Sequence, residues 1–402
     1  MQQAIEQTLF DGMAAEAARD APPAGFPALP MIPGARYTDP EFLALETRFL
    51  WKKSWLYALH ADELPRPGSY RLWRRTGSPI IIVRGRDDRI RAFYNTCRHR
   101  GAPLVADGQG ETRGFFCRYH GWTYTLEGKL TAVREKRDFP GMDTSCLGLS
   151  EVRCEQLGHW VFINEDPEAP PLIEALAPIP EHLAEMQLER IRHVHSASFE
   201  VACNVKILLD AFLETYHLKS IHPQTVDRFL ESRGTFHLLW NNGNSLMVTP
   251  HRREDWEDPG AVGMPAIETA PQIFAEQNAS YNAYPNLITP ISATGIPFLT
   301  FWPNGPRDMI VDVHWFAPEG AHGHELWPTR ISNFVRILEE DTQFAPQIQE
   351  SVESGGFKGM YLSYQERRIY HWHEALDRKI GHENIPEPLR VRPMLGDWVS
   401  AA

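Results

Sequence analysis

Two short segments each place a cysteine close to a histidine. Residues 97–99 read Cys-Arg-His, and residues 117–120 read Cys-Arg-Tyr-His after seventeen intervening residues. Each segment follows a predicted strand and enters a turn, with Gly101 after the first and Gly121 after the second. Two loops at the tip of a β domain could therefore each offer one thiolate and one imidazole to a shared site. The four candidate ligands are Cys97, His99, Cys117 and His120.

Two kinds of metal group would suit these four ligands. A structural zinc ion with two Cys and two His ligands is chemically sound. Zinc sites of that class usually begin with paired cysteines, whereas each loop here mixes Cys with His. A [2Fe–2S] cluster with two cysteines on one iron and two histidines on the other would take one of each from each loop. Imidazole ligands also raise the reduction potential above that of an all-thiolate cluster, so the pattern favours an electron relay.

A second group of polar residues lies in residues 204–223. On a helix, Asp210, Glu214 and His217 fall close to one face, and by itself this pattern fits an amphipathic helix with a solvated face. His222 follows His217 by five residues, which is about 140° around an ideal helix. Both histidines could bind one ion only if the helix bends or unwinds between them. The proline after His222 indicates a helix end nearby.

A carboxylate on a later predicted helix could complete this site. Asp341 falls between Leu338 and Ala345 on an apolar stripe, whereas Glu339 and Glu340 fall off it and are expected to be solvated. An unpaired carboxylate on a buried face is costly, so a metal ion explains Asp341 better than packing does, with a buried ion pair as the alternative. Two histidines and one carboxylate are the ligands of oxygen-activating Fe(II) enzymes.

The surrounding sequence divides into segments of different character. Residues 1–36 are rich in Ala and Pro and are expected to be a partly disordered tail, and 37–55 are expected to form a helix that packs on the C-terminal domain. Short β-rich runs and turns fill 56–165, which predicts a small all-β domain. A Pro-rich linker, 166–182, separates it from 183–402, where helices frame an antiparallel sheet. The fold class is therefore α+β.

Within the C-terminal domain we expect a helix at 201–221, strands at 235–249, 281–302 and 309–316, and a long helix at 327–354. The strands are expected to line a substrate pocket, although aromatic residues there also fit a plain core. The candidate pocket residues are Phe236, Leu238, Trp240, Met247, Tyr284, Phe298 and Phe301.

Composition limits the partners. The formal net charge of −12 argues against nucleic acid and against anionic lipid, and it would suit a basic redox partner. No stretch approaches the roughly 18 apolar residues that span a bilayer. The first 25 residues lack a cationic start followed by an apolar run, so a secretory signal is not expected and the cytoplasm is the expected location.

Both motifs resemble those of Rieske non-haem iron oxygenases, whose α subunits include the aromatic ring-hydroxylating dioxygenases. CRHRGAPL and CRYHGWTY resemble the family's cluster loops, and the strand segment before them matches as well. The resemblance covers about residues 37–375. It implies a Rieske domain, a START-like catalytic domain and a mononuclear Fe(II) held by His217, His222 and Asp341. Glu214 stands where the family has a bridging carboxylate, most often Asp, and Asp210 is a secondary candidate for that role.

The resemblance implies a terminal oxygenase that hydroxylates a small organic, aromatic substrate by monooxygenation, dioxygenation or oxidative demethylation. The chain has no Gly-x-Gly-x-x-Gly fingerprint, so a separate NAD(P)H-dependent reductase, with or without a ferredoxin, is expected to supply electrons. The family's bridge spans subunits, which implies a homotrimer, and a β subunit can accompany it. Two rivals are an electron carrier whose second domain only binds a ligand, and a zinc-stabilised adaptor fused to a hydrophobic-ligand module.

Overall fold

Two units with separate cores make up the chain. A computed structural model describes residues 1–106, 108–253 and 256–402. Lys52–Leu172 form one unit, here called the β unit, and Met1–Trp51 together with Ile173–Ala402 form the other, the α+β unit. The expected domain limits at 56, 165 and 183 lie within about ten residues of these boundaries. No helix in the described ranges is both long and apolar enough to cross a membrane.

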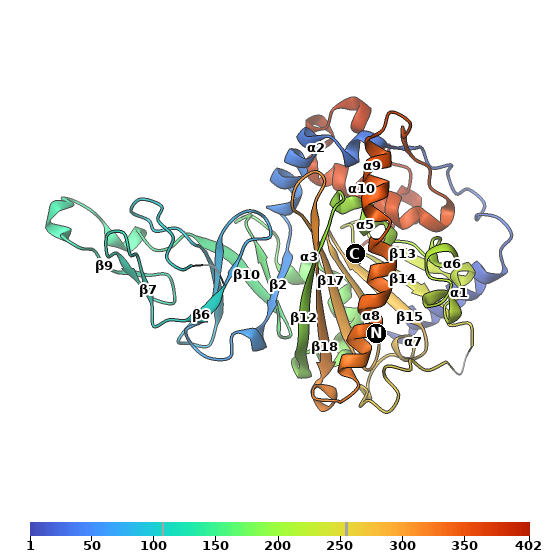
Figure 1. Cartoon of the computed structure of the whole chain (residues 1–402), viewed down its shortest axis with the longest axis horizontal. Coiled ribbons are helices and arrows are strands. Elements are labelled where there is room, and N and C mark those ends of the chain that lie inside the picture. Colours follow the sequence, from blue (N-terminus) through green and yellow to red (C-terminus); the bar gives the residue numbers. More distant parts are fainter. Residues whose placement is uncertain (107, 254–255) are drawn as a thin grey trace. The chain divides into compact units, whose positions relative to one another are not determined.

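The β unit is a seven-stranded antiparallel sheet with a small three-stranded sheet beside it (Figure 1). The strand order of the large sheet is β2-β11-β10-β5-β4-β3-β6, and that of the small one is β7-β8-β9. β-Branched residues favour these short strands, as in Ile80–Arg84, where four consecutive β-branched residues are buried. The bounds are β2 Leu56–His60, β3 Ser69–Trp73, β4 Ile80–Arg84, β5 Ile90–Tyr94, β6 Gln109–Glu111, β7 Phe115–Phe116, β8 Thr123–Tyr124, β9 Leu130–Ala132, β10 Glu151–Leu157 and β11 Trp160–Asn164.

A second seven-stranded antiparallel sheet forms the centre of the α+β unit, in the order β12-β18-β17-β16-β15-β14-β13. Neighbours in this order, apart from β12, follow one another along the chain, so hairpin-like connections build most of the sheet. The bounds are β12 Ile191–Val201, β13 Phe236–Leu239, β14 Ser245–Thr249, β15 Asn278–Ala283, β16 Leu287–Ile291, β17 Ile296–Pro303 and β18 Met309–Pro318.

Helices cover both faces of this sheet (Figure 1). One face, here called the helix face, meets α5, α8 and α10: Phe334 of α8 packs edge-on against Trp315, with ring centroids 5.7 Å apart. The other face meets α1 and α7, where Phe274 contacts Tyr281 at 6.2 Å. The bounds are α1 Gln3–Ala18, α2 Pro40–Leu45, α3 Leu172–Ala175, α4 Ile179–His182, α5 Val205–Ala211, α6 Leu218–Ile221, α7 Gln272–Glu276, α8 Trp327–Thr342, α9 Ala345–Glu353 and α10 Arg367–Ile380, with β1 Ile32–Pro33 paired to β19 Gly359–Met360.

The N-terminal tail is ordered, contrary to the expectation. Residues 3–18 form α1, which buries Leu9 and Met13 against the α+β unit. The Glu16 carboxylate accepts hydrogen bonds from the Tyr364 hydroxyl, at 2.7 Å, and from Arg367, at 3.0 Å. These contacts offset the entropy cost of ordering the segment, and its alanines favour a helix. The segment was expected to be disordered because it is rich in Ala and Pro. In the structure its buried positions are few and widely spaced, so the sequence shows no clear apolar stripe.

Two of the expected helices are broken. The one expected at 201–221 ends at Ala211, and a separate single turn, α6, begins at Leu218. The one expected at 327–354 ends at Thr342, and α9 begins at Ala345 with a proline in its first turn. That proline, Pro346, has no N–H to donate and its ring crowds the carbonyl of Thr342, so it ends one helix and starts the next.

The Pro-rich linker is held in place rather than loose. The side-chain amide groups of Asn242 and Asn244 donate to the carbonyls of Ala175 and Ala177 at 2.7 to 3.4 Å. Short helices, α3 and α4, form within or beside it. Residues 173–182 of this segment are therefore an ordered part of the α+β unit.

Candidate metal centres

The two Cys-His loops of the β unit share one backbone geometry. In both, the cysteine N–H donates to the carbonyl five residues on, at 2.9 Å for Cys97 and 2.8 Å for Cys117. The N–H of Gly101 or Gly121 donates back to the cysteine carbonyl, at 3.0 and 2.8 Å. Both glycines have a positive φ, 74° and 77°, which only glycine adopts without strain. The repeated turn points one thiol and one imidazole from each loop toward a common place.

The ligand atoms converge in the way that a two-iron group requires. The Nδ1 atoms of His99 and His120 lie 3.0 Å apart, as two ligands of one ion would. Cys97 and Cys117 are almost fully buried, and their thiols are neighbours. Burial raises the pKa of the Cys97 thiol.

One tetrahedral zinc ion would hold all four ligand atoms within about 4 Å of one another, given metal–ligand bonds of about 2.0–2.3 Å. Across the described residues, no three of the four loop ligands form a group within 4.8 Å. An elongated [2Fe–2S] group therefore fits these residues better than a single zinc ion does.

Polar and aromatic contacts surround the cluster loops. The Tyr124 hydroxyl lies 3.3 Å from the Sγ atom of Cys97 and accepts a hydrogen bond from the Arg98 N–H at 3.0 Å. The indole of Trp122 stacks on the His99 ring at 5.0 Å. Hydrogen bonds to the sulfurs and a partly dry surrounding are the features by which a protein sets the potential of such a cluster.

His217, His222 and Asp341 come together in the α+β unit. His222 Nε2 lies 2.9 Å and His217 Nε2 lies 3.5 Å from the same oxygen of Asp341. In the described part of the chain these are the three residues whose donor atoms all lie within 4.8 Å. The residues fit a mononuclear iron with open positions, because two imidazoles and one carboxylate leave the remaining sites free. When bound, iron at this site supplies the oxygen chemistry that no amino-acid side chain provides.

The break between α5 and α6 makes this arrangement possible. His217 and His222 stand at the two ends of the single helical turn α6, and their ring centroids lie 5.2 Å apart. On an unbroken helix from residue 201 their side chains would diverge. Asp341 reaches them from the last turn of α8, just before that helix ends.

Each histidine is also held from behind by a carboxylate. Glu214 Oε1 lies 2.5 Å from His217 Nδ1, and Glu340 Oε2 lies 2.7 Å from His222 Nδ1. Metal-binding histidines usually donate their other ring N–H to such a group, which fixes the tautomer and aims the free nitrogen at the ion. Glu340 was expected to be solvated; it is instead partly buried and also accepts a 2.5 Å hydrogen bond from Thr225. Glu339 is exposed, as expected.

Asp210, the secondary candidate for the bridging role, lies in a different polar cluster. Its carboxylate accepts a 2.6 Å hydrogen bond from the Tyr37 hydroxyl and lies 3.6 Å from His373 Nε2. One turn earlier, the Lys206 ammonium pairs with Glu46 at 2.8 Å. The polar stripe of α5 is therefore buried, not solvated, and it joins α5 to the N-terminal segment and α10.

The candidate pocket residues do not share one surface. By the sheet register, Met247 and Phe301 point to the helix face, where Phe301 contacts Phe212 at 5.2 Å, whereas Phe236, Leu238 and Phe298 point to the opposite face. Phe236 packs against Gly12 of α1. Trp240 is buried and Tyr284 is partly buried, and both lie beyond the ends of strands. Met247 and Phe301 are thus the two that lie on the same face as the helices bearing the metal ligands.

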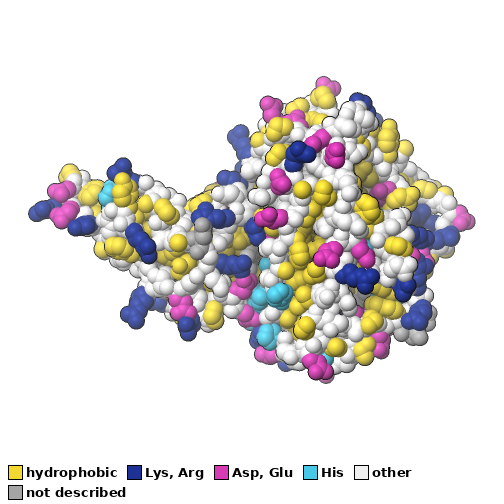
Figure 2. Space-filling model, viewed as in Figure 1, with side chains coloured by type: hydrophobic (Ala, Val, Ile, Leu, Met, Phe, Trp, Pro, Cys, Tyr) yellow, Lys and Arg dark blue, Asp and Glu magenta, His cyan; other side chains and the backbone are white. Residues whose placement is uncertain are grey.

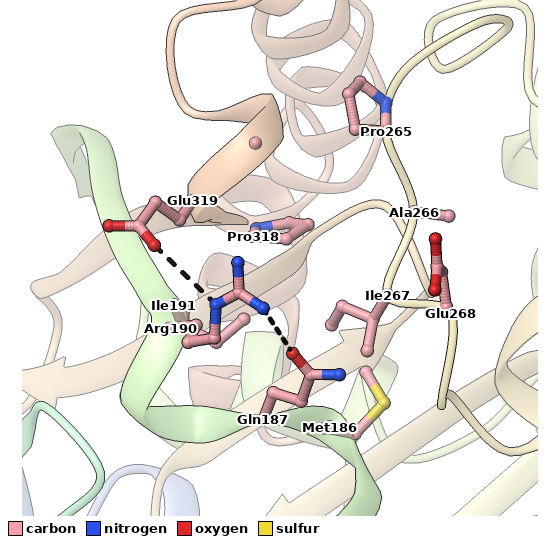
Figure 3. Close-up of a pocket in the computed structure, with 11 residues that line it drawn as sticks. Met186, Gln187, Arg190, Ile191, Pro265, Ala266, Ile267, Glu268, Pro318 and Glu319 are labelled. Atoms are coloured by element: carbon pink, nitrogen blue, oxygen red, sulfur yellow. Dashed lines mark hydrogen bonds and ion pairs between the residues drawn. The ribbon is translucent and has the colours of Figure 1, made fainter.

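A surface hollow elsewhere in the α+β unit contains none of these residues (Figure 3). Two of its charged groups pair, since Arg190 Nε lies 3.7 Å from Glu319, and Arg190 also donates to the Gln187 side chain at 3.2 Å. Figure 3 shows both contacts crossing the hollow. None of the candidate metal ligands lines it.

Charge is distributed unevenly between the two units. Residues 52–172 carry 19 Lys and Arg against 15 Asp and Glu, a net of +4, and the rest of the chain carries 21 against 37, a net of −16. Exposed arginines flank the cluster loops at Arg98, Arg100 and Arg118. Figure 2 shows Lys and Arg side chains, in dark blue, at several places on the β unit. The whole chain is acidic, but the β unit, which carries the cluster loops, is therefore basic.

Comparison with known families supports both centres. Residues 54–144 match the Rieske [2Fe-2S] domain, and residues 188–382 match the catalytic domain of the ring hydroxylating alpha subunit. The chain belongs to the Rieske non-haem iron oxygenase family. Both cofactors inferred from the ligand geometry, a [2Fe–2S] cluster and a mononuclear iron, are those of this family.

Individual relatives of this Rieske oxygenase chain act on different substrates. The glycine betaine monooxygenase oxygenase subunit of Chromohalobacter salexigens is 30% identical over 202 residues, 50% of this chain and 45% of that protein. The carnitine monooxygenase oxygenase subunit of Escherichia coli is 34% identical over 218 residues, 52% of this chain and 57% of that protein. The matched segments therefore span about half the length of these curated relatives.

Solved structures share the fold. A quaternary ammonium Rieske monooxygenase superposes with a TM-score of 0.75 at 20% identity, covering 90% of this chain and all of that one. Naphthalene 1,2-dioxygenase from a Rhodococcus species gives 0.74 at 19% identity, covering 94% and 98%. The α+β class and the arrangement of a Rieske domain with a helix-and-antiparallel-sheet catalytic domain are confirmed.

Proposed function

We propose that this chain is the terminal oxygenase component of a multicomponent system. It would insert oxygen from O2 into a small organic substrate with electrons from a separate reductase. For a monooxygenation, one O2, two electrons, two protons and the substrate C–H group give the hydroxylated product and one water. The observation that supports this best is the His217, His222 and Asp341 group, held from behind by two carboxylates, in a chain that also carries the cluster loops.

The chain's own residues have distinct tasks in this proposal. The cluster would be bound by Cys97, His99, Cys117 and His120. Glu214 and Glu340 would keep an imidazole N–H on the far side of each ring, so that both Nε2 atoms stay free for the metal. Buried side chains on the helix face would exclude water and position the substrate.

We propose that Glu214 bridges the metal site of one subunit and the cluster of another, so that electrons pass between them. Its neighbour Tyr216 is 67% exposed, and 20% of the His217 side chain is exposed, so this edge of the site is open to a second copy. His99 and His120 are also partly exposed on the β unit. A bridge requires Glu214 Oε2 to exchange its backbone N–H partners for an imidazole of the other copy. A ring of three subunits, with or without a β subunit, would satisfy this arrangement.

The electron donor is proposed to present an acidic face, not the basic one that the net charge of the whole chain suggested. The β unit carries a net charge of +4, and its exposed arginines border the cluster loops. Complementary charge raises association rates and makes them fall with salt. Reduction of the chain by a donor should therefore slow as ionic strength rises.

Metal and turnover measurements test the proposal together. Iron and acid-labile sulfide should be found at three irons to two sulfides per chain. Oxygen uptake with a surrogate reductase, screened over betaines, aromatic compounds and ethers, should be substrate-dependent and should yield a hydroxylated or demethylated product. Two irons per chain and no substrate-dependent oxygen uptake would indicate an electron carrier instead. Zinc without acid-labile sulfide would indicate the zinc-stabilised adaptor.

A further inference from the structure

One arginine of the α+β unit is fully buried without a carboxylate partner. Arg368, in the first turn of α10, lies over the helix face of the sheet. It donates to the Ser245 hydroxyl at 2.8 Å and to the Ser280 carbonyl at 3.0 Å, and its Nη1 has no hydrogen-bond partner. Burial lowers its pKa to about 9, so it still carries its charge at neutral pH.

Other buried cations of the same unit are compensated. Arg36 pairs with Asp377 at 2.7 Å, Lys206 with Glu46 at 2.8 Å, and Arg367 with Glu16 at 3.0 Å. Within the described residues, no carboxylate lies within salt-bridge distance of Arg368. An unpaired buried charge costs several kcal/mol, so its retention requires an explanation.

A buried imidazole near Arg368 is also without partners. His237, on β13, faces the same side of the sheet as Ser245 and Met247, and it is 5% exposed. Neither ring nitrogen has a hydrogen-bond partner. Burial, followed by the charges of Arg367 and Arg368, lowers its pKa well below the usual value. Two unpartnered nitrogens and one uncompensated cation on one sheet face would suit an anion.

A purely structural role for Arg368 accounts for only part of this. Pro290 lies opposite Ser280 in the sheet and has no N–H to offer, so one Arg368 N–H can serve the Ser280 carbonyl. That role would need a donor, not a charge. Water molecules would satisfy Nη1 and His237, but they would leave the charge uncompensated.

Hydrogen bonds join the segments next to these residues with the segment that carries the metal-site histidines. Gln365, one turn before Arg368, donates to the Thr215 hydroxyl at 2.9 Å. Thr215 bonds the hydroxyl of Thr235 at 2.9 Å, and Thr235 stands two residues before His237. Thr215 itself follows Glu214 and precedes His217 by two residues. The segments that carry Arg368 and His237 are therefore hydrogen-bonded to the segment that carries Glu214 and His217.

We propose that Arg368 and His237 form an anion subsite that binds the carboxylate of the substrate and holds the rest of the molecule toward His217, His222 and Asp341. The inference rests on the proposed oxygenase function and names its substrate class: small organic carboxylates, either betaine-like or aromatic acids. The guanidinium supplies the charge and a free N–H, and the imidazole supplies a further N–H.

Binding without turnover tests the subsite. The probes are glycine betaine against choline, and benzoate against benzyl alcohol, each pair differing by a carboxylate. At 10 mM probe, at least one carboxylate should raise the midpoint of thermal unfolding of the protein, and its matched alcohol should not. Arg368→Gln should abolish that shift and weaken binding by about 30-fold or more, and His237→Gln should weaken it less. Any of three results would overturn the proposal: the alcohols shift the midpoint as much as the carboxylates do, no carboxylate shifts it, or Arg368→Gln retains the shift.

The stability of the probe-free variants gives a second, independent readout. Arg368→Gln removes an uncompensated charge, so its unfolding midpoint should equal or exceed that of the parent protein. The matched control Arg367→Gln, which breaks the Glu16 pair, should lower it. A large drop in Arg368→Gln alone would mark the residue as structural. Since none of these measurements needs electrons or O2, carboxylate binding without oxygen uptake would refute the oxygenase proposal and leave the subsite standing.

Discussion

Replacing Glu340 should weaken iron binding although Glu340 does not touch the metal. Its Oε2 atom lies 2.7 Å from His222 Nδ1 and is fixed by a 2.5 Å hydrogen bond from Thr225. Loss of such a supporting carboxylate costs about 10- to 100-fold in metal affinity, which is about 1.4 to 2.7 kcal/mol. Glu340→Gln keeps a hydrogen-bond acceptor but loses the charge, so its loss of iron affinity should be near about 10-fold. Glu340→Ala loses both, so its loss of iron affinity should be near about 100-fold.

Chelator competition measures this effect directly. The mononuclear iron is the total iron minus the amount that acid-labile sulfide assigns to the cluster, and its retention is followed as chelator concentration rises. Glu339→Gln is the matched control, because Glu339 is the preceding residue on the same helix and is exposed. The reasoning would be refuted if Glu340→Ala held iron as tightly as the parent protein, or if Glu339→Gln lost it equally.

Three further outcomes are expected. Asp341→Ala should lose mononuclear iron and substrate-dependent oxygen uptake while retaining two irons and two sulfides per chain; iron analysis showing three irons would remove Asp341 from the ligand set. Tyr124→Phe removes the hydroxyl that lies 3.3 Å from Cys97 Sγ. Losing a hydrogen bond of about 1 kcal/mol should lower the reduction potential of the cluster by about 40 mV. Spectroelectrochemistry measures this potential, and an unchanged value would contradict the prediction. Burial lowers the pKa of His182 to about 4, so the unfolded chain binds the additional proton between pH 6.5 and 4, and stability is lost as pH falls. The free energy of unfolding is measured with urea at pH 7 and at pH 5. Its decrease between these pH values should be about 2 kcal/mol smaller in His182→Gln than in the parent protein, and equal decreases would contradict the assignment.

The four candidate cluster ligands could be named from the sequence because each half of that site is local in sequence. Cys97 and His99 are held by one turn, and Cys117 and His120 by another, and both turns need the glycine that the sequence shows. What the sequence did not determine is how the two loops approach each other. The 3.0 Å separation between the two imidazoles depends on the packing of the whole β unit.

The mononuclear site was only partly predictable. Asp341 could be proposed from the sequence because it interrupts an apolar stripe, and the histidine spacing indicated a break in the helix. Glu340 could not be found in this way, since its role depends on where His222 lies, 118 residues earlier. The edge strand β12 was missed for a different reason: only its first and last residues, Ile191 and Val201, are buried, so it lacks the alternation of a half-buried strand.

The uneven charge gives the chain a basic β unit, with a net of +4, and an acidic α+β unit, with a net of −16. The β unit of one copy attracts the α+β unit of another, and such a contact joins different surfaces of the two molecules. Contacts of this kind either close into a ring or continue as an open fibre, depending on the rotation between neighbours. Salt weakens both, but a closed ring of three gains one contact more than an open row of three. Dilution into moderate salt should therefore dissolve fibres before it dissociates rings.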